Sequence, residues 1–336
     1  MDEGILTAIG NTPLVRLKRV IKDIPFRLYA KLESLNPGGS TKDRPALAII
    51  KQGLETGTIG NDTTIVESSS GNMGIGLAQV CAYYGLKFIC VVDAKTTEQN
   101  IKMLETYGAE IDFVSDPDPV TGEYLQARIE RVKTLLQKHR NSFWPNQYTN
   151  TNNPRAHHQT MQEIVTAIGG EIDYLFCSVS TCGTIRGCAE YVREFKMRTK
   201  VIAVDAVGSA IFDQKKAKRL IPGHGASIKP ELFHPDLADE CIHVTDLDCI
   251  VGCRRLVRHE AILAGGSSGG VVMAVGYALD RIPSGATCVA IFPDRGERYL
   301  DTIYADAWVR CNFGDVSRFW EDPDSERVLP MTYENA

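Results

Sequence analysis

Short apolar runs alternate with helical patterns along most of this 336-residue chain. Residues 88–92 (FICVV) are apolar at every position, which is typical of a strand in a parallel sheet that helices cover on both faces. In the predicted helix 44–56, Leu47, Ile50 and Leu54 fall on one face. This alternation predicts an α/β protein with open, doubly wound sheets in two lobes. The predicted strands span residues 26–31, 64–67, 87–92, 173–179, 200–206 and 286–293, and the predicted helices span residues 44–56, 72–84, 98–108, 123–139, 157–168, 184–195 and 269–279.

A loop rich in glycine and hydroxyl groups at residues 36–45 (NPGGSTKDRP) holds one lysine, Lys42, just before a predicted helix. Glycines let the backbone approach a bound molecule closely. A lysine in such a loop can form a Schiff base with an aldehyde cofactor. The same residues also suit an ordinary helix start, with Ser40 or Thr41 as the cap and Pro45 in the first turn. The loop by itself does not separate these two interpretations.

Further loops of this kind follow predicted strands and open predicted helices. Residues 67–74 (ESSSGNMG) place three serines before a helix start, where hydroxyls, free N–H groups and the helix dipole attract a carboxylate. An ordinary helix cap would need only one of these serines. Residues 178–184 (SVSTCGT) suit a phosphate instead, but they lack the lysine of a P-loop and the G-x-G-x-x-G pattern, which argues against ATP and dinucleotides. For the loop at residues 265–270 (GGSSGG), close backbone packing is nearly as good an explanation as binding.

A lysine for an aldehyde, a loop for a phosphate and a loop for a carboxylate are together what pyridoxal 5′-phosphate and an amino-acid substrate require. Four segments also resemble, in the expected order, the signatures of fold-type II pyridoxal-phosphate enzymes of the cysteine synthase group. These segments are residues 11–15 (NTPLV), 36–44 (NPGGSTKDR), 69–74 (SSGNMG) and 265–269 (GGSSG). The resemblance extends from about residue 6 to about residue 311.

The resemblance implies a role for each of these segments. Lys42 would be the Schiff-base lysine, Asn72 would bond the ring hydroxyl of the cofactor, and Ser267 would face its pyridine nitrogen. A neutral serine at the pyridine nitrogen favours β-elimination and β-replacement over transamination. By the same resemblance, the residues that hold the cofactor phosphate would be Ser180, Thr181, Cys182, Gly183 and Thr184, and those that hold the substrate carboxylate would be Ser69, Ser70, Gly71 and Asn72.

The family also implies a domain organisation like that of the tryptophan synthase β-subunit. Residues 1–36 and 150–311 would form the larger, cofactor-binding lobe. Residues 37–149 would form a smaller, mobile lobe that carries the lysine and the substrate loop. Residues 312–336 would be a C-terminal extension, and the protein would be a homodimer.

Several segments depart from the cysteine synthase pattern. The phosphate loop usually reads Gly-Thr-Gly-Gly-Thr, whereas residues 180–184 read STCGT, and Met73 replaces the usual threonine. Together with residues 93–95, 119–128, 146–148, 222–227 and 293–300, these departures resemble a narrower subfamily. Its members join O-phospho-L-serine to L-glutamate through an aminoacrylate and release phosphate, toward 2,3-diaminopropionate for siderophores or peptide antibiotics.

In that subfamily, Arg128, Tyr148 and Ser180 are the expected substrate-binding positions outside the cofactor loops. An arginine suits a carboxylate or phosphate because its fork can bond two oxygens at once. Ser180, in place of glycine, adds a hydroxyl that could orient an incoming amine. The alternative for Arg128 is a surface arginine on the predicted helix 123–139, which also carries Arg131 and Lys133.

Composition narrows the class of protein. The net charge of −5 gives no sign of nucleic acid or an anionic membrane as a partner. The acidic N-terminus does not resemble a signal peptide, and no apolar stretch is long enough to span a membrane. The ten cysteines lack paired metal-ligand spacing, so we expect free thiols in a reducing cytoplasm and no metal.

Three other functions share some of these motifs. A cysteine synthase that uses O-acetylserine or O-phosphoserine with sulfide would need the same cofactor loops. A serine or threonine dehydratase would need them without an acceptor. A non-catalytic scaffold could keep the fold, although the presence of Lys42 argues against it.

Overall fold

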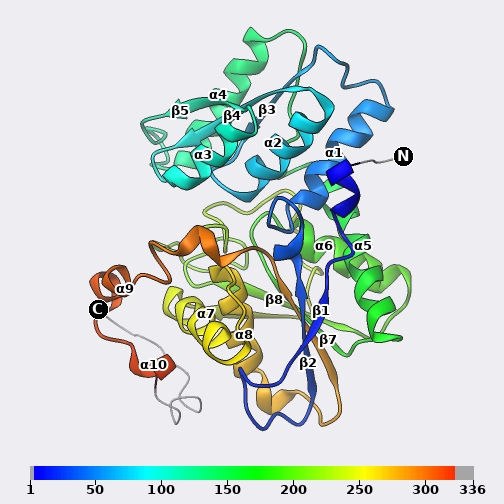
Figure 1. The fold of residues 1–336 in the computed structure, drawn as a ribbon, viewed down its shortest axis with the longest axis vertical. Coiled ribbons are helices and arrows are strands. Elements are labelled where there is room, and N and C mark those ends of the chain that lie inside the picture. Colours follow the sequence, from blue (N-terminus) through cyan, green and yellow to red (C-terminus); the bar gives the residue numbers. More distant parts are fainter. Residues whose placement is uncertain (1–3, 322–336) are drawn as a thin grey trace.

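The computed structural model describes residues 4–321. These residues contain two sheets, which lie one above the other in the view of Figure 1. The six-stranded sheet has the order β1-β2-β10-β7-β8-β9, in which only β1 is antiparallel to its neighbour. Its strands are β1 (Leu14–Leu17), β2 (Arg27–Leu32), β7 (Tyr174–Ser178), β8 (Lys200–Ala206), β9 (Glu240–Val244) and β10 (Thr287–Phe292). The four-stranded sheet is parallel throughout and has the order β5-β4-β3-β6. It contains β3 (Thr64–Ser68), β4 (Lys87–Asp93), β5 (Glu110–Val114) and β6 (Ser142–Phe143).

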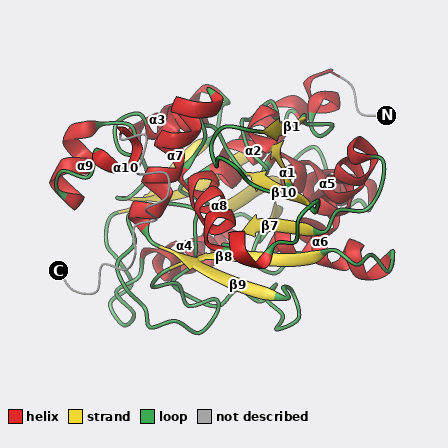
Figure 2. Ribbon diagram, turned by 90° about the horizontal axis from the view of Figure 1, so that it is seen from below, coloured by secondary structure: helices red, strands yellow, loops and turns green. Residues whose placement is uncertain are grey.

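Helices cover both faces of the six-stranded sheet. In Figure 2, β10, β7, β8 and β9 run side by side. The helices α5 (Asn152–Ile168) and α6 (Gly183–Glu194) pack on one face, and α7 (Asp246–Glu260) and α8 (Gly266–Tyr277) pack on the other. Along β8, Ile202 and Val204 enter the cluster around α7 and α8, whereas Val201 and Ala203 enter the cluster around α5 and α6. The strand is therefore apolar at successive positions because both of its faces are buried.

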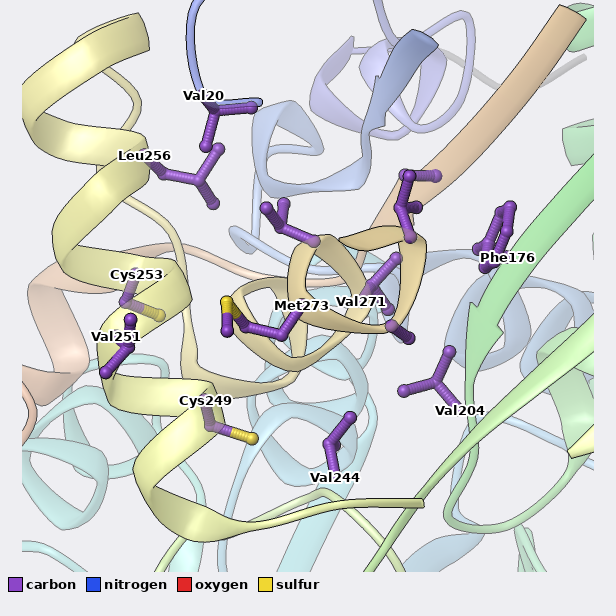
Figure 3. Close-up of a cluster of buried hydrophobic side chains, with 14 of the residues drawn as sticks. Val20, Phe176, Val204, Val244, Cys249, Val251, Cys253, Leu256, Val271 and Met273 are labelled. Carbon is purple, nitrogen blue, oxygen red and sulfur yellow. The ribbon is translucent and has the colours of Figure 1, made fainter. Parts of the chain in front are cut away.

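Close packing of α7 against α8 explains part of the glycine-rich loop at residues 265–270. Figure 3 shows Cys249, Val251, Cys253 and Leu256 of α7 beside Met273 of α8. A Cβ added at Gly269 would lie 2.1 Å from the carbonyl oxygen of Cys249, so the two backbones are nearly in contact. The packing interpretation of this loop is thus correct for Gly269, while Ser267 borders a cavity described below.

The four-stranded sheet is also covered on both faces. The helices α1 (Asp43–Glu55), α2 (Asn72–Tyr84) and α3 (Glu98–Thr106) lie on one face, and α4 (Tyr124–Lys138) lies on the other. Leu47, Ile50 and Leu54, which were predicted to share one face of α1, all pack against the same hydrophobic cluster. Ile49 and Ile50 are fully buried, whereas Leu47 and Leu54 are only partly buried at its edge.

All six predicted strands and seven predicted helices are present, with small shifts at their ends. The prediction missed β1, β5, β6 and β9, because short or half-exposed strands lack a continuous apolar run. It also missed α7, although Thr245 and Asp248 form a capping box at its start. The helices α9 (Asp306–Phe313) and α10 (Arg318–Glu321) were not predicted either.

The chain passes between the sheets twice, once between β2 and β3 and once between β6 and β7. The expected lobe limits at residues 37 and 149 fall within these two connections, and the exact limits stay a prediction. Within residues 1–36, Leu6 and Ile9 pack into the hydrophobic cluster of the four-stranded sheet. Part of the expected C-terminal extension also packs into the protein. Val316 and Phe319 are buried in the cluster around α7 and α8, whereas residues 322–336 lie outside the described residues.

All ten cysteines are free, and eight of them are buried. Among residues 4–321, no group of three or more His, Cys, Asp or Glu side chains is placed to hold a metal ion. None of the helices in this part of the chain is long and apolar enough to cross a membrane.

Candidate active site

A cavity of about 730 Å³ lies where loops from both sheets meet. The loops that follow β3, β4, β7 and β10 all reach it, as expected for the carboxyl ends of parallel strands. Every site residue predicted from the sequence borders this one cavity, although the role of each stays a prediction. These residues are Lys42, Ser69, Ser70, Gly71, Asn72, Arg128, Tyr148, Ser180, Thr181, Cys182, Gly183, Thr184 and Ser267.

Lys42 immediately precedes α1 and borders the cavity. Its side chain keeps some accessible area because it faces the cavity, yet the protein around it lowers the pKa of the amine below its ordinary value by desolvation. Asp294 and the thiols of Cys177 and Cys182 partly oppose this shift. A lowered pKa increases the fraction of neutral amine, which is the form that attacks an aldehyde. Lys42 itself is the residue before α1 and no side chain caps this helix, so the predicted cap by Ser40 or Thr41 is wrong, although Pro45 does lie in the first turn. The Schiff-base interpretation stays a prediction.

A buried ion-pair network fixes the chain just after Lys42. The guanidinium of Arg44 bonds Glu33 through Nε at 2.6 Å and through Nη2 at 2.8 Å. It also bonds Glu163 of α5 through Nη1 at 2.8 Å and Nη2 at 2.7 Å. Lys31 donates to the same Glu163 at 2.6 Å. The network therefore ties the start of α1 to β2 and α5 of the other sheet.

The loop before α6 has the geometry of an anion-binding site. Cys182 adopts a left-handed conformation with φ of 66°, which explains why glycine is usual at this position in the cysteine synthase pattern. A Cβ at Gly183 would lie 2.1 Å from Oδ1 of Asn153, so glycine is required here by close approach. The hydroxyl of Thr184 lies 3.2 Å from Nε2 of His157. Burial holds the pKa of this histidine well below its ordinary value. The site therefore has no cationic histidine, and an anion would depend on N–H groups, hydroxyls and the helix dipole.

In the loop at residues 69–72, Ser69, Ser70 and Asn72 make different contacts. The hydroxyl of Ser69 accepts from the N–H groups of Gly74 at 2.9 Å and Gly71 at 3.3 Å. The hydroxyl of Ser69 thus binds N–H groups at the start of α2, as a helix cap does. The sequence had left this role open as the alternative to anion binding. Ser70 borders the cavity, and within residues 4–321 its hydroxyl has no hydrogen-bond partner. The side-chain amide of Asn72 donates to Oδ2 of Asp294 at 2.8 Å.

Arg128 is buried and is not a surface residue of α4. Only 7% of it is exposed, whereas the side chain of Arg131 is 46% exposed and pairs with Asp112 on the surface. Nε of Arg128 lies 3.1 Å from Oδ2 of Asp93, but neither Nε nor Nη1 has a hydrogen-bond acceptor among the described residues. Burial raises the pKa of the nearby Tyr148 phenol, and the charge of Arg128 partly opposes that shift. The surface interpretation of Arg128 is therefore wrong.

Asp294 is a cavity residue that the sequence analysis did not single out. It lies after β10, is 2% exposed, and borders the cavity together with Lys42. Its Oδ2 accepts from Asn72 and from the Tyr299 hydroxyl at 2.6 Å, while its Oδ1 is buried without a partner in residues 4–321. Desolvation raises its pKa above the ordinary value. Residues 293–300 were noted only as part of a resemblance, and nothing local marks this aspartate as buried.

The family follows from a comparison with known proteins. The model of the family described as "Pyridoxal-phosphate dependent enzyme" matches residues 5–294. The chain belongs to this family of pyridoxal-phosphate-dependent enzymes. A relative from Cupriavidus metallidurans (strain CH34), N-(2-amino-2-carboxyethyl)-L-glutamate synthase, is 46% identical over 310 residues, which are 91% of each chain.

Solved structures of similar enzymes share the fold. O-acetylserine dependent cystathionine β-synthase from Helicobacter pylori has a TM-score of 0.84 and 32% identity, over 91% of this chain and 99% of that one. A hydrogen sulfide-producing enzyme from Fusobacterium nucleatum has a TM-score of 0.83 and 33% identity, over 89% of this chain and 100% of that one. The pyridoxal-phosphate enzyme described here is therefore a fold-type II, cysteine-synthase-like enzyme. The names of these neighbours indicate different reactions, so the fold by itself does not identify the acceptor substrate.

The residues around the cavity fit the cofactor of the family. The hydroxyls of Ser180, Ser267 and Ser70 border the cavity, and none of them bonds a residue within 4–321. The buried Oδ1 of Asp294 likewise has no partner there. A buried polar atom such as this one rarely stays without a partner unless a polar molecule satisfies it. Pyridoxal phosphate offers an aldehyde, a ring with polar substituents and a phosphate, which match the lysine, the polar side chains and the loop before α6.

Proposed function

We propose that this enzyme joins O-phospho-L-serine to L-glutamate to give N-(2-amino-2-carboxyethyl)-L-glutamate and phosphate. The observation that carries the proposal is the excess of cationic side chains around the cavity. Besides Lys42, the cavity is bordered by Lys95, Arg128, Lys218, Arg219 and Arg298, against the acidic Asp93, Glu123 and Asp294. Sulfide needs no such surroundings, whereas phosphoserine brings a carboxylate and a phosphate, and glutamate brings two carboxylates. The similarity to a synthase of this name supports the same choice.

The proposed roles follow the geometry of the loops. The N-terminus of α2, with Ser70 and Asn72, would bind the carboxylate of phosphoserine. Arg128, which has two buried nitrogens without acceptors, would bind its phosphate. Lys42, with its lowered pKa, would accept the α-proton and return it later. Bound pyridoxal phosphate would supply the electron sink for this proton loss.

The overall reaction balances without an oxidant or reductant. The bond between the β-carbon and the phosphate oxygen breaks, and a bond forms between the β-carbon and the glutamate nitrogen. The amine loses one proton, and inorganic phosphate leaves. The hydroxyls of Ser180 and Tyr148 border the cavity without partners in residues 4–321 and would orient the incoming amine.

A product assay tests the proposal directly. Purified enzyme is incubated with phosphoserine and glutamate, and the products are identified by mass spectrometry while released phosphate is measured. We expect one adduct for each phosphate. Parallel reactions supply sulfide as the acceptor or no acceptor. Faster formation of cysteine would identify a cysteine synthase, and pyruvate without an acceptor would identify a dehydratase.

Two variants test the proposed roles. Lys42→Ala should lose turnover and the visible absorbance of bound cofactor, and product formation at the wild-type rate would contradict its role. Arg128→Gln should raise the KM for phosphoserine by about 10- to 100-fold, because a charge-assisted hydrogen bond contributes about 1.5–3 kcal/mol. Arg131→Gln, on the exposed face of the same helix, is the matched control. Unchanged kinetics for both substrates would remove Arg128 from the site.

The oligomeric state, the location and the downstream product are also proposals. We propose a homodimer in the cytoplasm and a supply of 2,3-diaminopropionate for a siderophore or an antibiotic, which the cavity itself does not address.

A further inference from the structure

Arg219 lies on a loop of the six-stranded sheet, between β8 and β9, and borders the cavity with its neighbours Ala217, Lys218, Leu220 and Ile221. Hydrogen bonds hold this part of the loop. The N–H groups of Leu220 and Ile221 donate to the carboxylate of Asp246 at 2.7 and 3.2 Å. On the other side of Arg219, the N–H of Ala217 donates to the carbonyl oxygen of Gly208 at 3.2 Å. The segment is therefore held on both sides of Arg219, which limits the entropy lost when a ligand binds.

The guanidinium itself is placed by one backbone contact. Nη1 of Arg219 donates to the carbonyl oxygen of His224 at 2.7 Å. The close approach depends on Gly225, where φ is 68° and an added Cβ would lie 2.8 Å from Nη1. This part of the chain belongs to the segment 222–227 that departs from the cysteine synthase pattern. The orientation of Arg219 is therefore built into the loop.

Arg219 has no carboxylate partner among residues 4–321. Its hydrogen bond to His224 uses one of the five N–H donors of a guanidinium, and no ion pair includes it. Asp205, Asp246 and Glu123 act on it only at longer range, and burial lowers its pKa. An arginine keeps its charge under such conditions, so Arg219 is a half-buried cation whose remaining N–H donors are available to an anion.

The other arginines of the cavity are engaged differently. Arg128 has Asp93 as an ion-pair partner and belongs to α4 of the four-stranded sheet. Arg298 donates to the carbonyl oxygen of Gly38 in the Lys42 loop. Arg219 is thus the arginine of the cavity that lies beside the exposed Lys218 and Pro222, at a solvent-facing part of the lining.

We infer that Arg219 binds the side-chain carboxylate of the acceptor and so selects a dicarboxylic amino acid. In glutamate the α-carboxylate is next to the reacting amine, whereas the side-chain carboxylate lies three carbons further out. The inner carboxylate must stay near Lys42, so the outer one can reach the solvent-facing end of the cavity. A guanidinium matches a carboxylate with two parallel hydrogen bonds. This inference rests on the proposed use of glutamate.

The test compares Arg219→Met, Arg219→Lys and the matched control Lys216→Met, an exposed residue of the same loop that does not border the cavity. With saturating phosphoserine, Arg219→Met should raise the KM for glutamate by about 10- to 100-fold, the range expected for losing a charge-assisted hydrogen bond. The wild-type preference for glutamate over glutamine should fall by a similar factor. Arg219→Lys should keep part of the preference, and Lys216→Met should keep all of it.

A second readout separates acceptor binding from a general defect. The change in cofactor absorbance on adding phosphoserine alone should have the same midpoint in Arg219→Met as in the wild type. A glutamate KM and a glutamine ratio like those of the wild type would overturn the inference while leaving the proposed function intact. A weaker phosphoserine midpoint would also overturn it, because Arg219 would then bind the donor. If the wild type made no adduct with glutamate, the proposed function would fail and this inference with it.

Discussion

The buried network around Arg44 offers the sharpest test of how the site is held in place. The side chains of Arg44 and Glu33 are 2% and 0% exposed, and Glu163 is 10% exposed. In Arg44→Met, Glu163 would keep Lys31 as a partner. Glu33 would keep only neutral donors, the hydroxyl of Thr12 at 2.7 Å and the amide of Asn36 at 3.1 Å. The variant would thus leave a fully buried carboxylate without a cation.

Removing one partner of a buried ion pair costs about 3–5 kcal/mol in the free energy of unfolding. Arg131→Met is the matched control, because Arg131 makes an equally short pair with Asp112 at 2.7 Å but on the surface. An exposed pair contributes about 0–1 kcal/mol. With a urea m value of about 3 kcal/mol/M, the expected shift in midpoint is about 1–1.7 M for Arg44→Met and less than about 0.3 M for the control.

Urea unfolding followed by tryptophan fluorescence measures both variants at neutral pH. Equal midpoints for Arg44→Met and Arg131→Met would refute the reasoning. They would mean that the burial of the network does not raise its contribution above that of a surface pair.

Three further outcomes are expected. Desolvation alone would raise the pKa of the Glu163 carboxyl, but its bonds to Arg44 and Lys31 lower that pKa to about 2. The contribution of Glu163 to stability is therefore present above its ordinary pKa of 4.5 and is lost as the pH falls toward 2. Wild-type stability in urea should therefore fall more steeply between about pH 5 and pH 3 than that of Glu163→Gln, and parallel curves would contradict this. Asp294→Asn should weaken pyridoxal phosphate binding about tenfold, measured by cofactor fluorescence, because Asn72 loses a charged acceptor; unchanged binding would exclude that role. Gly269→Ala should cost about 1–3 kcal/mol in thermal unfolding, whereas Gly170→Ala, with open space around it, should be nearly neutral.

Local patterns in the sequence were sufficient to predict the central strands and most of the helices. A strand buried on both faces must be apolar throughout, so β4 and β8 are visible without any knowledge of their neighbours. The edge strands β5 and β9 were missed because half-exposed strands carry a weaker pattern. The loops around Lys42 and before α6 could be found because glycine and hydroxyl residues precede a helix there, but the Lys42 loop by itself also suited an ordinary helix start.

The sequence by itself therefore determined the fold class, the cofactor family and the residues that could bind an anion or an aldehyde. Only the tertiary structure decided which of these residues already bond other residues of the protein and which are left for a ligand. It assigned Ser69 to a helix cap, removed Arg128 from the surface, and left Arg219 beside the cavity without a carboxylate partner among the described residues. The physical reason is that burial and pairing depend on residues far apart in the chain. A charged side chain has the same local sequence whether water, a neighbouring carboxylate or a substrate satisfies it.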